Sequence, residues 1–177
     1  SLGVEQFGSV NIWGTNSPEW FLADLAAIFA GGKAAGIYPT DTVDQVTFKC
    51  IHSGSKVVFV EDNGKVDKFA QMVDNLPQLL TIVVWADTPT MATLNRKTGD
   101  SVSVLSWDDF MGKGATVEDS ALQARIDAQD PGHCCTLIYT SGTTGNPKAV
   151  MISHDNIIFE ARCVAAEMPK IAAEPSE

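Results

Sequence analysis

The sequence predicts an α/β fold in which a mostly parallel sheet is flanked by helices. Short apolar segments at residues 56–60, 81–85 and 134–139 have the length and the β-branched content of buried strands. Segments with apolar residues at helical spacing lie between such strands, as at residues 66–76. Strands and helices that alternate at these lengths are typical of βαβ units, which place neighbouring strands in parallel.

The first part of the chain predicts a strand followed by a largely buried helix. Residues 9–14 form the strand, and Ser17 caps a helix that begins at Pro18. The glycines that follow lie after a helix rather than a strand, so they do not form a dinucleotide-binding motif. We interpret them as sites of close backbone packing: Gly31, Gly32 and Gly36.

Residues 36–42 predict a turn-rich connection into a second helix over residues 43–52. Either Asp41 or Thr42 can cap that helix. Asp41 and Asp44 could also be drawn as paired carboxylates for a metal ion, but helix capping explains them better.

The middle of the chain alternates between apolar strands and more polar segments. In order, the sequence predicts a strand at 56–60, a helix at 66–76, a strand at 81–85, a surface insertion at 86–99, a short edge strand at 102–105, a helix at 107–111 and a polar surface helix at 117–128.

The last part predicts a buried strand at 134–139, a polar loop, a second short apolar run at 149–152, and a helix at 154–168. Ser153 can cap that helix. His154 follows the loop and invites a role as general base, although a partly buried or helix-capping histidine fits its place better.

Composition narrows the class of protein. Hydrophobic residues make up 45% and charged residues 19% of the 177 residues, as in a globular domain with a core. The net charge of −10 argues against nucleic acid as a partner, because the field of the protein would repel phosphate backbones. The cysteines and histidines lack zinc-ligand spacing, so we expect no metal site and reduced thiols in or near the core: Cys50, Cys134, Cys135 and Cys163.

Neither a secretory signal nor a membrane span is predicted. Residues 1–20 lack a basic start, and charged residues and glycines interrupt the longest apolar stretch, at 21–38. We therefore expect a cytoplasmic protein, and peripheral contact with an intracellular membrane stays open.

The polar loop has the composition of a phosphate-binding site. Residues 139–148 are Tyr-Thr-Ser-Gly-Thr-Thr-Gly-Asn-Pro-Lys. Glycines let successive N–H groups point into one concavity, hydroxyls add donors, and the lysine adds a cation that suits phosphate. We predict that phosphate is bound by Thr140, Ser141, Gly142, Thr143, Thr144, Gly145 and Lys148, with Lys148 stabilising developing charge.

Two other interpretations of the loop are weaker. A flexible linker would not usually lie between two apolar runs at a strand edge. A Walker-type loop fails because Pro147 stands where its second glycine belongs, and Ala149 stands where Ser or Thr should follow the lysine.

Residues 139–154 resemble the signature phosphate-binding loop of the adenylate-forming enzymes, whose usual form is Tyr-Thr-Ser-Gly-Thr-Thr-Gly-x-Pro-Lys-Gly. This chain matches every specified position except the last, where Ala149 replaces glycine. In that family the loop grips the β- and γ-phosphates of ATP while a carboxylate attacks the α-phosphate. The resemblance implies that residues 1–177 are an incomplete segment, truncated at both ends, of the large N-terminal adenylation domain.

Further residues are similar to the long-chain fatty acid–CoA ligases, and more narrowly to their bubblegum-type branch. The resemblance rests on residues 11–14, 16–21, 29–32 and 36–38, and then on Cys134-Cys135, Asn146 and Asp155-Asn156. It implies a ligase that uses ATP, Mg²⁺ and coenzyme A to activate a long-chain or very-long-chain fatty acid through an acyl-adenylate. Adenylation needs no base, because the acid is already ionised at neutral pH.

The resemblance also implies that the parts that bind adenine, ribose, magnesium and coenzyme A lie beyond Glu177, so that this chain alone is inactive. Two alternatives stay open. The chain could be a truncated module that binds nucleotides or a partner without catalysis, or part of an adenylating enzyme for a non-lipid acid.

Overall fold

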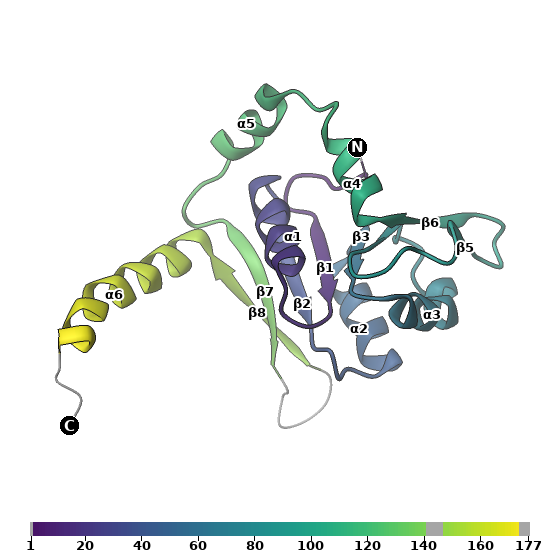
Figure 1. Cartoon of the computed structure of the whole chain (residues 1–177), viewed down its shortest axis with the longest axis horizontal. Helices are drawn as coiled ribbons and strands as arrows, with labels where there is room; N and C mark the ends of the chain where they lie inside the picture. Colours follow the sequence, from purple (N-terminus) through teal and green to yellow (C-terminus); the bar gives the residue numbers. More distant parts are fainter. Residues whose placement is uncertain (1, 141–146, 174–177) are drawn as a thin grey trace.

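The computed structural model describes residues 2–140 and 147–173, and their side chains up to residue 168. Within these residues the strands form one eight-stranded sheet in the order β5-β6-β4-β3-β1-β2-β7-β8 (Figure 1). The strands are β1 (Ser9–Trp13), β2 (Lys33–Ile37), β3 (Val57–Val60), β4 (Thr81–Val84), β5 (Thr93–Asn95), β6 (Ser101–Ser106), β7 (Cys134–Thr140) and β8 (Lys148–Ser153).

The sheet is parallel in its interior and antiparallel at both edges. Pairs from β6 through β4, β3, β1 and β2 to β7 are parallel, whereas β5 pairs antiparallel with β6, and β8 with β7. Helices on both faces cover the parallel strands, as such sheets require. The predicted α/β fold with a mostly parallel sheet is therefore confirmed.

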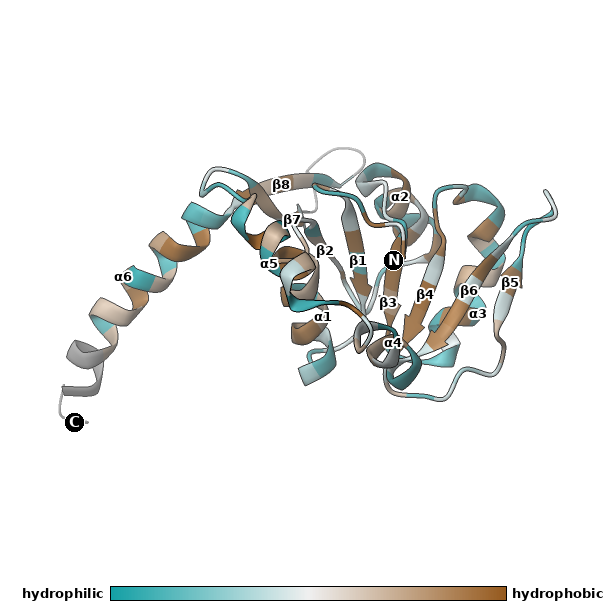
Figure 2. Cartoon of the chain, turned by 90° about the horizontal axis from the view of Figure 1, so that it is seen from above, coloured by the Kyte–Doolittle hydropathy of each residue, from teal (hydrophilic) through white to brown (hydrophobic). Residues whose placement is uncertain are grey.

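The helices that pack on the sheet are divided between its two faces. In Figure 2, α1 and α4 lie on one side of the sheet, and α2 and α3 on the other. The helices are α1 (Pro18–Phe29), α2 (Val43–Ser53), α3 (Asn63–Met72), α4 (Trp107–Gly114), α5 (Asp119–Asp127) and α6 (His154–Ala173), and a 3₁₀ turn, η1 (Val73–Asn75), follows α3.

Local capping explains where the first helices begin. The Ser17 hydroxyl accepts a hydrogen bond from the Trp20 backbone N–H at 3.1 Å, as predicted. Of the two candidates for α2, Thr42 is the cap, and it forms a capping box with Gln45. The Asp62 side chain caps α3, which therefore starts at Asn63, earlier than its apolar spacing predicts.

The core has two parts, one on each face of the sheet. Apolar residues of α2 and α3 pack on Trp13, Val58 and Ile82, whereas Ala23 and Ala27 of α1 pack on the opposite face. Residues that alternate along β1, β3 and β4 contribute to both parts, because successive side chains of a strand point to opposite faces. All four tryptophans belong to or pack against these clusters, as expected: Trp13, Trp20, Trp85 and Trp107.

The sequence patterns do not predict strands β2 and β5, and they place β6 at the edge of the sheet, where it does not lie. The sequence predicts no strand at residues 33–37, yet β2 is a central strand there. Alanine and glycine have low intrinsic strand propensity, so this strand depends on its pairing with β1 and β7. The prediction of residues 102–105 as an edge strand is wrong, because β5 forms within the predicted insertion and pairs with β6.

A buried arginine explains why the insertion is ordered. The Arg96 guanidinium is 7% exposed and donates to the backbone carbonyls of Val73, Leu76 and Leu79. It also pairs with Asp100. A charged residue in a polar stretch therefore anchors the β5–β6 hairpin to η1, and hydrophobic periodicity gives no sign of that contact.

The cysteines and the longest apolar stretch can now be placed. All four cysteines are free thiols, and Cys163 is exposed on α6, so the expectation of a core or near-core position is wrong for that residue. No described helix combines the length and hydropathy needed to cross a bilayer.

Gly32 tests the interpretation of close backbone packing. A Cβ atom there would lie 2.8 Å from the Gly8 carbonyl oxygen and 3.1 Å from that of Ala27. We expect Gly32→Ala to lower the free energy of unfolding by about 1–3 kcal/mol in urea denaturation, because neither backbone atom can move freely. The matched control is Gly112→Ala, at an exposed helical site with nothing within 4 Å, which should stabilise the protein by about 0.5–1 kcal/mol. Equal midpoints for the two variants would contradict the interpretation.

Candidate phosphate-binding site

The predicted loop lies at the tip of the antiparallel β7–β8 hairpin. Thr140 pairs with Lys148, and Tyr139 with Ala149, so the hairpin brings both ends of the loop together. Directly opposite residues of an antiparallel pair lie on the same face, so the side chains of Thr140 and Lys148 share one face. The remaining predicted phosphate ligands lie outside the described residues: Ser141, Gly142, Thr143, Thr144 and Gly145.

Lys148 is available to an anion. It is exposed at the first position of β8, and among the described residues it forms no ion pair. The Thr140 hydroxyl, also exposed, lies 3.5 Å from the Lys148 carbonyl oxygen, at the limit of a hydrogen bond. A hydroxyl and an ammonium without a competing carboxylate suit the oxygens of a phosphate group.

The hairpin tip lies at the edge of the sheet where parallel strands bind ligands. Because β7 runs parallel to β2, Thr140 lies at the carboxyl edge of the strands. Strand β1 leads to α1 on one face, and its neighbour β2 leads to α2 on the other. The connections that leave the carboxyl ends of β1 and β2 therefore diverge to opposite faces, and open α/β sheets bind ligands in crevices outside the carboxyl ends of their strands.

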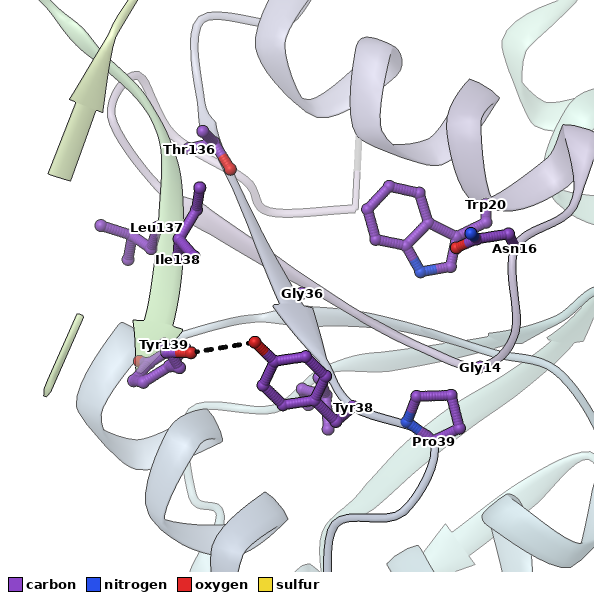
Figure 3. Close-up of a pocket in the computed structure, with 11 residues that line it drawn as sticks. Gly14, Asn16, Trp20, Gly36, Tyr38, Pro39, Thr136, Leu137, Ile138 and Tyr139 are labelled. Carbon is purple, nitrogen blue, oxygen red and sulfur yellow. Dashed lines mark hydrogen bonds between the residues drawn. The ribbon is translucent and has the colours of Figure 1, made fainter. Parts of the chain in front are cut away.

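A cavity of about 300 Å³ lies at this edge, beside the carboxyl ends of β1, β2 and β7. Figure 3 shows Trp20 and Asn16 on one side of it, and Tyr38 on the other with its hydroxyl directed at the Tyr139 carbonyl. The lining residues come from β7, the end of β2, the turns after β1 and β2, and the first turn of α1: Gly14, Asn16, Trp20, Gly36, Ile37, Tyr38, Pro39, Thr136, Leu137, Ile138 and Tyr139.

Tyr139 connects the base of the hairpin to helix α2. Its side chain is 2% exposed, its hydroxyl lies 3.1 Å from His52 Nδ1, and the hydroxyl donates to the Lys49 carbonyl oxygen at 3.3 Å. Burial raises the pKa of Tyr139 to about 12, so the phenol is neutral at physiological pH. A buried neutral phenol at this place supports the hairpin rather than the chemistry of a substrate.

Strand β7 is only half-buried, although its sequence predicts a buried strand. Cys135, Leu137 and Tyr139 are buried, whereas Ile138 is 47% exposed. The face that carries Ile138 is uncovered because α6 runs from the end of β8 away from the sheet (Figure 1). The β8–α6 corner consequently presents an apolar groove of about 770 Å³, lined by Ile138, Ile152, Asn156, Ile157, Glu160, Ala161, Val164, Ala165 and Met168.

His154 does not reach the loop. It is the first residue of α6, at the end of β8 opposite Lys148, and the strand between them spans roughly 17–20 Å. Its backbone N–H donates to the His133 carbonyl at 3.1 Å. Burial lowers the pKa of His154, and nearby His133 lowers it further. The distance from Lys148 argues against a role as general base beside that lysine, and the partly buried position favoured by the sequence is confirmed.

The described residues offer no cluster of three or more histidine, cysteine or acidic side chains that could hold a metal ion. Asp41, one of two carboxylates considered for such a site, instead pairs with Lys49 and accepts a hydrogen bond from the Tyr38 N–H at 3.1 Å. The expectation that it caps a helix is also wrong, because Thr42 does so. Sequence reasoning missed Asn16 and Tyr38, whose positions just after strands β1 and β2 could have drawn attention to them.

The fold recurs in adenylate-forming enzymes. The anthranilate–CoA ligase AuaEII, solved with anthranoyl-AMP, matches with a TM-score of 0.70 at 22% identity, over 91% of this chain and 28% of that one. ATP-bound MatB from Rhodopseudomonas palustris matches with a TM-score of 0.60 at 18% identity, over 93% of this chain and 28% of that one. The sheet and its helices thus have the α/β fold of the corresponding part of these enzymes.

The chain belongs to the AMP-binding enzyme family, whose profile matches residues 1–174. It is 42% identical to the long-chain-fatty-acid–CoA ligase ACSBG2 of Xenopus laevis, over 90% of this chain and 21% of that protein. It is 39% identical to human ACSBG1, over 91% of this chain and 21% of that protein. The chain therefore spans about a fifth of the length of these relatives. The resemblance to the bubblegum-type branch is confirmed.

The environment of His154 makes a testable prediction about pH. A histidine whose folded pKa lies below the usual 6.5 resists protonation, whereas the unfolded chain takes up the proton. The native state should therefore lose stability as pH falls below about 6.5, and His154→Gln should remove this part of the loss. NMR titration should show the His154 imidazole protonating below 6.5, and His133→Gln should raise its pKa. A value at or above 6.5 in the unaltered protein would contradict the environment described here.

Proposed function

We propose that this chain is the phosphate-binding part of the N-terminal adenylation domain of a long-chain fatty acid–CoA ligase. The observation that carries the proposal is the β7–β8 hairpin, in which Thr140 pairs with Lys148, a lysine without an ion pair among the described residues, next to Tyr139 in the lining of a cavity at the carboxyl edge of the sheet. The identity to such ligases, 36–42% over most of the chain, supports the choice of substrate class.

In the proposed reaction, a carboxylate oxygen of the fatty acid attacks the α-phosphorus of ATP. The bond from that phosphorus to the bridging oxygen breaks, and pyrophosphate leaves with the bonding electron pair. The thiolate of coenzyme A then attacks the acyl carbon of the adenylate and displaces AMP. No proton has to be removed from the acid in the first step, because it is ionised at neutral pH.

The residues of this chain would act on the leaving pyrophosphate. Negative charge grows on it as the bond breaks, and a preorganised ammonium and hydroxyl stabilise that charge most strongly in the transition state. We assign this role to Lys148 and Thr140, together with the predicted ligands Ser141, Gly142, Thr143, Thr144 and Gly145. Mg²⁺ would neutralise phosphate charge when bound, and in the proposal its acidic ligand belongs to further parts of the protein.

The proposal treats residues 1–177 as an incomplete segment of its domain, with residues 139–154 as the phosphate-binding loop. It is supported by the chain's coverage of about a fifth of its relatives and by apolar residues exposed on α6: Ile157, Ile158, Phe159, Val164 and Met168. Further parts would supply the sites for adenine, ribose, magnesium and coenzyme A. A long-chain acid partitions into bilayers, so the proposal includes a cytoplasmic enzyme that contacts an intracellular membrane peripherally.

Lys148 provides the direct test of this function. In the intact protein, Lys148→Ala should lower the rate of pyrophosphate release with palmitate by about 100-fold to 1,000-fold, as loss of one preorganised donor typically does. The matched control is Lys97→Ala, a 90% exposed lysine on the β5–β6 turn, which should retain the rate within about twofold. Unchanged turnover in Lys148→Ala would refute the proposed role of the hairpin.

The class of acid is tested separately. The intact protein should release pyrophosphate faster with palmitate than with benzoate or anthranilate, because the relatives of highest identity reported above are long-chain ligases. Preference for an aromatic acid would instead favour a non-lipid adenylating enzyme. ATP binding in calorimetry without turnover of any acid would favour a binding module.

A further inference from the structure

The pairing between β7 and its parallel neighbour β2 ends before β7 itself ends. Strand β2 pairs with β7 at Ala34↔Thr136 and Ala35↔Leu137. Within the described residues, the last part of β7 therefore has a ladder only on its other side, with the edge strand β8. That last part leads into Thr140 and the hairpin tip, so contacts other than the sheet must hold it.

Tyr139 provides those contacts. The Tyr38 hydroxyl, from the end of β2, donates to the Tyr139 carbonyl oxygen at 3.4 Å (Figure 3). On the opposite side, the Tyr139 hydroxyl reaches His52 and the Lys49 carbonyl. The apolar cluster here is small, with only Ala35, Leu137 and Tyr139 buried in it among the described residues, so polar contacts carry much of the attachment.

A buried ammonium lies between the two tyrosines. The Lys49 side chain is 2% exposed, and Lys49 Nζ lies 4.9 Å from the ring centroid of Tyr38 and 5.4 Å from that of Tyr139. Its counter-ion is Asp41, whose side chain is 9% exposed and also accepts the Tyr38 backbone N–H. The cation therefore contacts the end of β2, the turn after it and the end of β7 at once. We call Tyr38, Asp41, Lys49 and Tyr139 the clasp.

A buried ion pair is a weak source of stability, since desolvation of both charges offsets most of their attraction. A pair of apolar side chains could fill the same space at less cost. The geometry gives the charge another use, because a desolvated cation attracts the faces of two rings at once, and an apolar side chain does not. This favours a role in fixing the relative position of two strand ends.

We propose that Lys49 is a positioning residue, which acts through the clasp to hold the carboxyl end of β7 and so to fix Thr140 and Lys148 for phosphate. The consequence for phosphate rests on the proposed function, whereas the mechanical role of the clasp does not. The Lys49 side chain is buried beside the two tyrosine rings, so it acts on the hairpin through them.

Amide hydrogen exchange on this chain tests the mechanical role. We expect Lys49→Met to increase exchange at least about tenfold at residues 138–140 and 148–150, and to change it less than about twofold at Val58 and Val83 in the central strands. The matched control is Lys56→Met, which removes an exposed ion pair with Glu5 and should leave exchange at the hairpin unchanged.

Loss of one partner leaves a buried carboxylate unpaired, which could unfold the single variant. The double variant Asp41→Asn/Lys49→Met removes both charges, and we expect it to fold and to show the same local increase. Unchanged exchange at the hairpin in a folded variant would overturn the proposal. So would an equal increase throughout the sheet, because that result means general destabilisation.

ATP affinity then separates this inference from the proposed function. In the intact protein, calorimetry should show at least about tenfold weaker ATP binding for Asp41→Asn/Lys49→Met, with the Lys56→Met control unchanged. Equal affinity would overturn the positioning role. If the unaltered protein binds no ATP, the proposed function fails, and hydrogen exchange alone decides whether the clasp holds β7.

Discussion

The order of the strands around β1 determines where this protein can bind a ligand. Because β2 lies on one side of β1 and β3 on the other, α1 and α2 must cover opposite faces of the sheet. The connections that leave the two neighbouring strands therefore diverge, and a cavity remains at their carboxyl ends. The parallel direction of β7 brings the signature hairpin to the same edge.

Binding at this edge depends on local charge rather than on the field of the whole protein. The net charge of −10 repels a nucleotide, which is itself an anion. In the proposed site, Lys148 would offset this over a short distance, where an ammonium and a phosphate meet directly. Lys49, near the base of the hairpin, is instead buried against Asp41, so we assign the two cations different tasks.

Much of the fold follows from the sequence because its strands and helices obey simple periodicities. Val57–Val60 and Thr81–Val84 are rich in β-branched apolar residues, which favour strands. The Ser17 side chain caps α1, and serine at such a position predicts the start of a helix. The sequence does not predict β2, because its alanines and glycine form a strand only through pairing with β1 and β7. The sequence does not predict the proposed role of Lys49 either, since Lys49 contacts Tyr139, which lies far from it in the sequence. Motif reasoning identified the hairpin, but the cavity that adjoins it required the topology.

An acyl-phosphate derivative of ATP would test the central claim most directly. A lysine amine beside the terminal phosphate attacks the acyl carbon of such a reagent, and ATP leaves, so the acylated lysine marks the site of the phosphates. In the intact protein, mass spectrometry should find the acyl group on Lys148, and excess ATP should prevent the modification. Acylation of other lysines such as Lys113 with Lys148 unmodified, or modification of Lys148 that ATP does not reduce, would contradict a phosphate site at the β7–β8 hairpin.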